Sequence, residues 1–430
     1  MVHDIDERQL LAQVQREPSG RGRAVLANDY WPRPLPEGVH ISSHTLITYD
    51  GEVTRGTLYR PVNASGTVFC LMHPRQDLRQ HPIIPDILAA GDSVWAQAGR
   101  EVGNDLRLVH ENALLDVAAG LEWLQHTYSH VVLIGHSGGA GLYSFYTEQA
   151  QTEPGARIAN TPGGAPTKLR EAPMPVPDAL SLIAPHPGQG KLLLAAIDPS
   201  VTDESDPLSV DPELDPFDPR NGFGTAEDGG SHYAEGFVTA YRAAQAQRVA
   251  RIDERARELI DRQMSARKKV KSGTGTREDG RQSILTPIIT TYRTDADLRC
   301  TDLQLDPSER PYGSVISAKP SVSNYGVTGF GRLATPEAWL STWSGLSSNA
   351  SLNRSLAGIT VPTLIIEYTG DASVFHADVA AAVKVAASDD VTHHHIRADH
   401  FGRPLARGDE PGTSLAAHTI TEWSKERIKP

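Results

Sequence analysis

The chain has 430 residues, of which 39% are hydrophobic and 22% charged, and its formal net charge is −12. This length allows one large globular domain with an insertion, or two domains. The acidic balance argues against a nucleic-acid partner and against binding to an anionic membrane surface. The first residues lack the apolar core of a secretory signal, and no segment reaches the ~20 apolar residues of a membrane span. A cytoplasmic protein without membrane contact is expected.

The chain begins with a segment of unknown role and continues into a hairpin. Residues 1–39 are polar and interrupted by prolines, and are predicted to be an N-terminal extension. Two β-rich runs follow, at 40–49 and 52–60, and they meet at Asp50-Gly51. Asp-Gly between two such runs is a strong signal for a β-hairpin.

Short apolar runs and helical patterns then alternate up to residue 197. Buried strands are predicted at 67–72, 93–98, 131–134 and 180–184, and helices at 82–90, 105–125 and from 138 onward. Such alternation predicts a mostly parallel, doubly wound sheet with helices on both faces. Cys70, one of only two cysteines, lies in the first of these strands and is expected to be a core thiol.

The alternation stops after Ile197. Five Asp-Pro pairs lie between residues 198 and 220, and they predict irregular chain, because proline removes hydrogen-bond donors and aspartate favours turns. The prolines also break the spacing of a calcium-binding loop. A long amphipathic helix is predicted at 236–270, with Val238, Tyr241 and Ile252 on its apolar stripe. This stripe is expected to cover the rim of the active site.

Beyond this helix, a few β segments are expected at 286–317 and a helix at 335–346. The α/β pattern resumes with strands at 362–368 and 391–397 and helices at 377–387 and 414–427. One α/β domain, made of residues 40–198 and 331–430, is therefore predicted to be interrupted by an inserted, mainly helical cap at 199–330.

The clearest chemical signal is Gly135-His136-Ser137-Gly138-Gly139, which follows the strand at 131–134 and precedes a helix. In this context a serine lies on a sharp turn with its hydroxyl exposed, as a nucleophile does. The flanking glycines remove Cβ atoms where strand and helix crowd together. The first turn of the helix offers free N–H groups to a developing oxyanion.

A serine nucleophile needs a base and a group that orients the base. The strand at 362–368 leads into Asp371, and the strand at 391–397 leads into His400. Both side chains are thus predicted at the carboxyl edge of the sheet, in the order Ser, Asp, His. Glu367 and Asp399 are weaker candidates for the acid. His136 is too close to Ser137 in the chain to act as its base.

No metal site is expected. His393, His394 and His395 are consecutive within a strand, so alternate side chains point to opposite faces and are not expected to converge on one ion, and the run is interpreted as structural.

Two backbone N–H groups are expected to form the oxyanion hole. Gly138, after the nucleophile, should supply one, and the loop His73-Pro74-Arg75-Gln76 should supply the other. Because Pro74 has no N–H, Arg75 is the predicted donor. His73 and His136 are expected to line the substrate site.

With these residues the chain resembles the α/β-hydrolase superfamily of serine esterases and lipases, over about residues 40–197 and 331–430. The resemblance implies a hydrolase without metal or organic cofactor, in which an inserted cap often covers the active site. Two features depart from the family: His73-Pro74-Arg75 replaces the usual His-Gly, and the insertion is larger than a simple lid.

The expected function is hydrolysis of a small carboxylic ester through an acyl-enzyme on Ser137, His400 and Asp371. Hydrolysis of a thioester, an amide or a carbon–carbon bond would use the same residues. A different possibility is a non-catalytic ligand-binding protein of the same fold. A homodimer is possible.

Overall fold

The computed structural model describes residues 33–326 and 328–428. Eight strands form one sheet in the order β1-β2-β4-β3-β5-β6-β11-β12. Their bounds are β1 His40–Ile47, β2 Val53–Arg60, β3 Thr67–His73, β4 Ser93–Ala98, β5 His130–His136, β6 Ala179–Ile183, β11 Thr363–Tyr368 and β12 Val391–Ile396. Strand β2 is antiparallel to both neighbours, and the other adjacent pairs are parallel.

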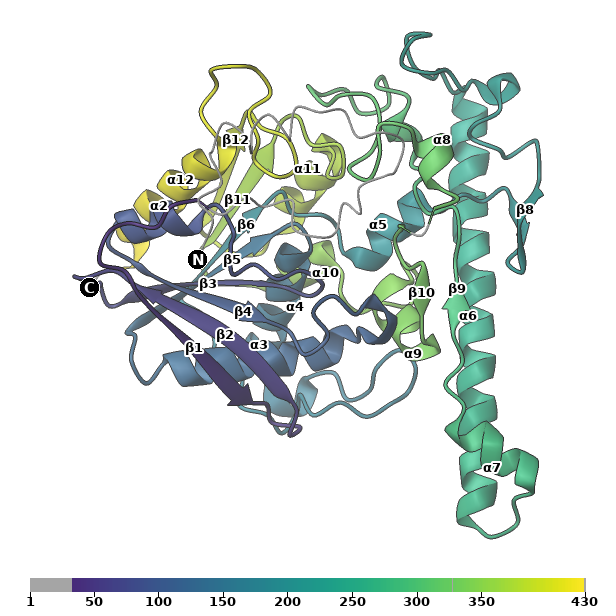
Figure 1. Ribbon diagram of the computed structural model, residues 1–430, viewed down its shortest axis with the longest axis horizontal. Coiled ribbons are helices and arrows are strands. Elements are labelled where there is room, and N and C mark those ends of the chain that lie inside the picture. The colour runs from purple at the N-terminus through teal and green to yellow at the C-terminus, as the bar shows by residue number, and fades with distance from the viewer. Residues whose placement is uncertain (1–32, 327, 429–430) are drawn as a thin grey trace, which may run out of the picture.

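Helices cover both faces of this sheet (Figure 1). One face carries α3 (His110–Leu124), α4 (Gly138–Gln151), α10 (Leu352–Leu356) and α11 (His376–Val385), and the other carries α2 (Ile84–Ala89) and α12 (Gly412–Arg427). Alternate residues of β3 enter the two cores, Cys70 on the first side and Phe69 and Leu71 on the second. A strand buried on both faces needs such a continuous apolar run. The predicted mostly parallel, doubly wound α/β sheet is confirmed.

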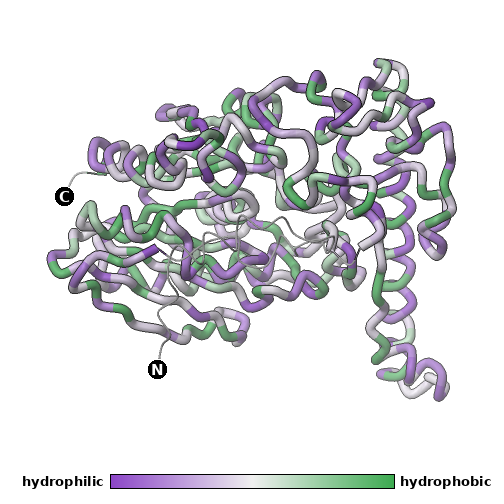
Figure 2. Tube along the Cα trace, turned by 45° about the horizontal axis from the view of Figure 1, so that its top comes forward, coloured by the Kyte–Doolittle hydropathy of each residue, from purple (hydrophilic) through white to green (hydrophobic). Residues whose placement is uncertain are grey.

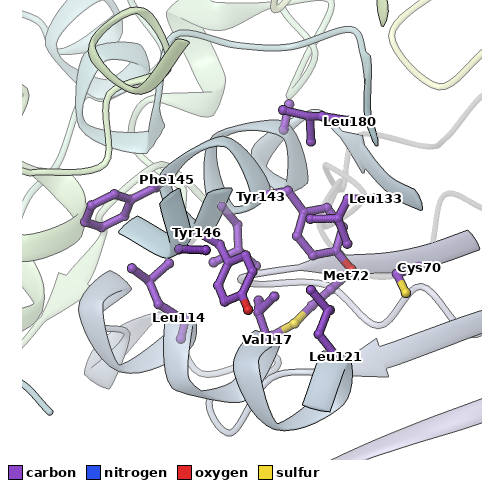
Figure 3. Packing of buried hydrophobic residues seen from close by; sticks show 14 of the residues in the cluster. Cys70, Met72, Leu114, Val117, Leu121, Leu133, Tyr143, Phe145, Tyr146 and Leu180 are labelled. Atoms are coloured by element: carbon purple, nitrogen blue, oxygen red, sulfur yellow. The ribbon is translucent and has the colours of Figure 1, made fainter. Parts of the chain in front are cut away.

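The core between α3, α4 and the sheet shows why these helices form where the sequence places them. Leu114, Val117 and Leu121 recur at helical spacing along α3 and pack with Tyr143 of α4 (Figure 3). Cys70 lies in the same core as a free, fully buried thiol, which confirms its prediction as a core residue.

The chain beyond β6 begins with α5 (Gln189–Ala196) and then leaves the sheet. The elements that follow are β7 Val201–Asp203, β8 Asp206–Val210, α6 Glu235–Lys271, α7 Arg277–Ile284, β9 Ile289–Thr290, α8 Pro320–Ser323, β10 Leu333–Ala334 and α9 Pro336–Ala338, with a π-helical turn over Trp339–Trp343. Helix α6 lies along one side of the molecule, and its far end projects away with α7 (Figures 1 and 2). Within 286–317 the only strand is the two-residue β9, so the expectation of several β segments was wrong. Prolines at 287, 307 and 311 remove the donors that a strand ladder needs.

The apolar stripe of α6 is buried against the body of the protein. Val249, Ile252 and Ala256 share one core with Leu193 of α5 and with the turn at 339–343. Asp253, on the same side, accepts a hydrogen bond of 2.8 Å from the indole N–H of Trp339. The stripe therefore attaches the helix and does not face the rim of the active site as expected.

Of the predicted N-terminal extension, residues 1–32 lie outside the described residues. Arg33 hydrogen-bonds to the carbonyl of Pro82 at 2.9 Å and to Asp86 at the start of α2. Across 33–326 and 328–428, no helix combines the length and the apolar character that crossing a bilayer requires.

Candidate active site

Ser137 occupies a strained turn between β5 and α4. Its φ of 55° and ψ of −119° lie outside the regions that non-glycine residues usually adopt. Its N–H donates to the carbonyl of Ile183 at 2.9 Å, which ties the turn to β6. A Cβ on Gly135 would lie 2.6 Å from Cα of Ala140, and one on Gly139 would lie 2.5 Å from the carbonyl oxygen of Met72. Only glycine lets the strand and helix approach this closely.

The structure brings Ser137, His400 and Asp371 together. Oγ of Ser137 lies 2.9 Å from Nε2 of His400, and Nδ1 of His400 lies 2.7 Å from Oδ2 of Asp371. His400 is 6% exposed and Asp371 2%. Hydroxyl, imidazole and carboxylate in such a series can activate a serine as a nucleophile.

The backbone fixes the carboxylate of this series. The loop after β11 carries Asp371, whose Oδ1 accepts hydrogen bonds from the N–H groups of Ser373 (2.7 Å) and Val374 (2.9 Å). Gly370 donates to the carbonyl of Ala398 at 2.9 Å, which joins this loop to the one that carries His400. Oδ2 thus stays directed at the imidazole.

Opposing effects set the pKa of His400. Burial lowers it, but the charge of Asp371 and the hydrogen bond to it outweigh burial, so the pKa is raised above its usual value. The neighbouring imidazoles behave differently, since burial lowers the pKa of His186 to about 3 and that of His73 well below its usual value. His400 is therefore the ring of this group that is closest to titrating near neutral pH.

The two weaker acid candidates have other partners. Glu367 lies on β11 and contacts His376, His393 and His395. Oδ1 of Asp399 accepts hydrogen bonds from the backbone N–H groups of Phe401 and Arg403, in the loop that carries His400. The contacts of Glu367 also correct one expectation: in a strand the first and third histidines of a run share a face, so His393 and His395 do converge.

A pocket opens beside Ser137. Its lining comes from the chain at or after the ends of five strands, β3, β5, β6, β11 and β12, and from the inserted segment. The residues are His73, Arg75, Gln76, Ser137, His186, Gln189, Leu192, Val315, Phe330, Ser373, His400 and Phe401. The free volume is about 30 Å³, which leaves room for no more than a few water molecules.

Arg75 lines this pocket, but its amide is already engaged. The N–H groups of Arg75 and Gln76 both donate to Nδ1 of His73, at 3.0 Å each. The guanidinium of Arg75 binds Asp105 at 2.7 Å and lies 4.8 Å from the ring of Trp343. This geometry is at odds with the prediction of Arg75 as an oxyanion donor, because the ring of His73 accepts the N–H that the prediction required to be open.

The same contacts orient the ring of His73 toward Gly138, the residue that follows Ser137. With Nδ1 accepting, the proton of the neutral ring lies on Nε2. Nε2 lies 2.7 Å from the position that a Cβ of Gly138 would occupy. His73 therefore presents an N–H next to Gly138 and lines the pocket, where the sequence placed it.

His136 does not line the pocket. Its Nε2 donates to the backbone carbonyl of His400 at 2.8 Å, and its Nδ1 lies 3.1 Å from Nε2 of His81. The ring is 1% exposed. His136 was expected to contact the substrate. Its ring instead contacts the backbone of His400 and the ring of His81, and so supports the loop that carries His400.

His186 and Gln189 were missed by the sequence reasoning. Their side-chain nitrogens lie 3.1 and 2.5 Å from the same Cβ position of Gly138, and Nδ1 of His186 accepts from Gly188 at 3.1 Å. Both residues follow β6. The rule that loops at the carboxyl ends of parallel strands carry the site could have identified them.

No protein-family model matches the chain, and no curated protein matches its sequence. Many solved structures are similar to it in fold, including the following three. The DcsB complex with its substrate analogue has 12% identity and a TM-score of 0.49, with 91% of this chain and 100% of that one covered. The α/β hydrolase GrgF from Penicillium sp. sh18 has 12% identity and a TM-score of 0.47, with 90% of this chain and 99% of that one covered. The esterase domain of a Rhodothermus marinus protein has 12% identity and a TM-score of 0.41, with 90% of this chain and 98% of that one covered. At such distances these similarities indicate no substrate.

Proposed function

We propose that this protein is a serine hydrolase that cleaves a carboxylic ester through an acyl-enzyme. The observation that carries the proposal is the hydrogen-bonded series of Ser137, His400 and Asp371, with distances of 2.9 and 2.7 Å. The strained backbone of Ser137 supports it, because strain of this kind is kept where a function requires it.

In the proposed reaction, Nε2 of His400 takes the hydroxyl proton while Oγ of Ser137 attacks the acyl carbon. Asp371 accepts the Nδ1 proton in a hydrogen bond, keeps the ring in the required tautomer and stabilises the imidazolium. The imidazolium then gives its proton to the leaving alcohol. His400 then takes a proton from a water molecule, which attacks the acyl-enzyme. The proton passes to Oγ of Ser137 as the carboxylic acid is released.

The oxyanion is proposed to bind to the N–H of Gly138 and to Nε2–H of His73. Gly138 begins α4, a helix of 14 residues, whose free N–H groups and positive dipole end favour negative charge. Nε2 of His73 lies beside Gly138. Since His73 is neutral, it can donate this hydrogen bond without competing with His400 for the proton of Ser137.

The substrate is proposed to be a small ester, admitted when part of the inserted segment moves. Val315 and Phe330 belong to residues 199–330, the proposed cap, and both line the pocket. A free volume of about 30 Å³ is too small for an acyl group of several carbons. These two side chains are the cap's contribution to substrate choice, and none of the bond-breaking groups belongs to the cap.

Other substrates would use the same residues. Hydrolysis of a thioester, of an amide or of a carbon–carbon bond next to a carbonyl also forms an oxyanion next to Ser137. A non-catalytic ligand-binding protein is the alternative of a different class. The alignment of the Ser137 hydroxyl with His400 favours catalysis over it, because mere ligand binding requires no such alignment.

The test combines covalent labelling with turnover. A fluorophosphonate probe should label the wild-type protein, and Ser137→Ala should abolish labelling and lower kcat on short p-nitrophenyl esters by roughly 10⁴ to 10⁶. Ser144→Ala is the matched control, since Ser144 is buried on the same helix outside the pocket, and it should retain activity. If Ser137→Ala kept a tenth of the wild-type activity, another nucleophile would have to be sought.

A further inference from the structure

A second cluster of chemically reactive side chains lies outside the pocket, next to the last strand of the sheet. Glu367 of β11 is 6% exposed. Its Oε1 lies 2.9 Å from Nδ1 of His376, and its Oε2 lies 3.1 Å from Nε2 of His393 and 3.3 Å from Nε2 of His395. None of these four residues lines the pocket beside Ser137.

The fold assembles this cluster from three elements. Strands β11 and β12 are parallel, with Glu367 opposite His395, and His393 shares the face of His395 because side chains alternate along a strand. The rings of His393 and His395 lie 4.3 Å apart. His376 is the first residue of α11. His394 points to the opposite face of β12.

The electrostatics of the cluster favour a cation. Within the described ranges, the ion-pair partners of Glu367 are these three imidazoles, which do not carry the permanent positive charge of an arginine. A buried carboxylate without a fixed positive partner is costly. A bound metal ion would supply the missing charge and would use the nitrogen lone pairs that neutral imidazoles offer.

We propose that Glu367, His376 and His395 bind one divalent transition-metal ion, with Zn²⁺ as the best match and His393 next to it as a fourth ligand. One ligand atom from each of the first three residues lies within 4.8 Å of the others. Bonds of ~2.0 Å in a tetrahedron place ligand atoms ~3.3 Å apart. Nδ1 of His376 lies 2.9 Å from Oε1 of Glu367, and Nε2 of His395 lies 3.3 Å from Oε2 of the same carboxylate, so small side-chain shifts would bring all three residues to one ion. Two or three imidazoles with one carboxylate suit zinc, whereas magnesium and calcium prefer oxygen ligands only.

The site would connect the two loops that carry Asp371 and His400. Glu367 lies four residues before Asp371, His376 lies five residues after it, and His395 lies five residues before His400. A metal ion bound here would hold the ends of β11 and β12 and the start of α11 together. Its role is structural, and it does not depend on the reaction proposed for Ser137.

The experiment uses the full chain without an affinity tag, stripped with a chelator and dialysed. Calorimetric titration with ZnCl₂ at neutral pH should give one equivalent bound, and Co²⁺ should give the visible absorption of a site with nitrogen ligands. The melting temperature should rise by several degrees with Zn²⁺, since a ligand that binds only the folded state stabilises it. His395→Ala and His376→Ala change half-exposed side chains and should weaken Zn²⁺ binding at least tenfold.

His394→Ala is the matched control, because this histidine occupies the same strand but the other face, and it should bind Zn²⁺ as the wild type does. Circular dichroism checks that each variant is folded. Failure of the wild type to bind one equivalent would overturn the proposal. So would equal affinity in His395→Ala, His376→Ala and the wild type, or loss of binding only in His394→Ala. Fluorophosphonate labelling of Ser137 should persist in the stripped protein, so this result is separable from a failure of the hydrolase proposal.

Discussion

Two carboxylates that lie four residues apart, Glu367 and Asp371, have different surroundings. Asp371 has passed the end of β11 and turns toward His400, with a contact of 2.7 Å. Glu367 is still within the strand and faces His376, His393 and His395. Position along the chain therefore separates their roles. Asp371, in the loop, orients the proposed base, whereas Glu367, in the strand, contacts histidines of α11 and β12.

These surroundings predict opposite results for two isosteric substitutions. Asp371→Asn should lower kcat by about 10⁴ at neutral pH, because an amide stabilises the wrong tautomer of the base. Glu367→Gln should lower kcat far less, since it does not contact His400. Steady-state kinetics on one ester compares both variants. The reverse ranking would assign the acid to Glu367.

The pKa of His400 predicts the pH dependence of the reaction. The proposed base must be neutral, so kcat/KM should fall with decreasing pH as the ring becomes protonated. Because the folded protein raises the pKa of His400 above its usual value of 6.5, this fall should be centred above pH 6.5. Asp371→Asn should move the residual activity's acid limb to lower pH, since it removes the charge that raises the pKa. A limb centred well below pH 6.5 in the wild type would contradict the assignment of His400.

At the scale of elements, the inserted segment has two separate roles. Helix α6 uses its stripe for attachment, with Ile252 3% exposed in the core that contains Trp339. Phe330, farther along the segment, lines the pocket. Length and amphipathicity made α6 the obvious candidate for contact with substrate, but the residues of the inserted segment that line the pocket, Val315 and Phe330, lie in irregular chain.

Substitutions in these two places should therefore differ in effect. Ile252→Ala should lower the free energy of unfolding by ~2–5 kcal/mol through the cavity it leaves, with no change in preference among esters. Phe330→Ala should also lower stability, because Phe330 is buried in the same core, but unlike Ile252→Ala it should raise kcat/KM for longer acyl chains, because it enlarges the pocket. Denaturant unfolding and a series of acyl esters measure the two effects. A changed preference in Ile252→Ala alone would return the stripe of α6 to the pocket.

At the scale of the whole molecule, the inserted segment and the α/β core share apolar contacts. Ile252 of α6 lies in one core with Leu193 of α5 and with Trp339. Asp253 adds hydrogen bonds to Trp339 and to Ser344, at 2.8 Å each. Removing the segment would expose these side chains to water.

We expect the protein to unfold as one unit for this reason. Calorimetry and circular dichroism should give the same midpoint and a single transition, as a cooperative two-state unit does. Ile252→Ala should shift that one transition to lower temperature without splitting it. Two resolved transitions would indicate that residues 199–330 form an independent domain beside the core.

The sequence by itself determined the sheet and the position of the chemistry along it. Apolar runs of strand length, such as Val131 to Ile134, can be buried only in a sheet covered on both faces. The loops that follow parallel strands meet at one edge, so Ser137, Asp371 and His400 could be placed together from the order of strands alone. These inferences rest on local periodicity and on the direction of the chain, and both are written in the sequence.

Only the tertiary structure decided which atoms face the pocket. Which way a ring or an amide turns depends on partners distant in sequence: His136 turns to the carbonyl of His400, and the stripe of α6 packs on α5. Even the local contact of the Arg75 amide with His73 depends on how the loop is folded. Likewise Glu367 meets His376 and His395 because two strands pair in one register, and a register between strands distant in the chain cannot be read from either strand alone.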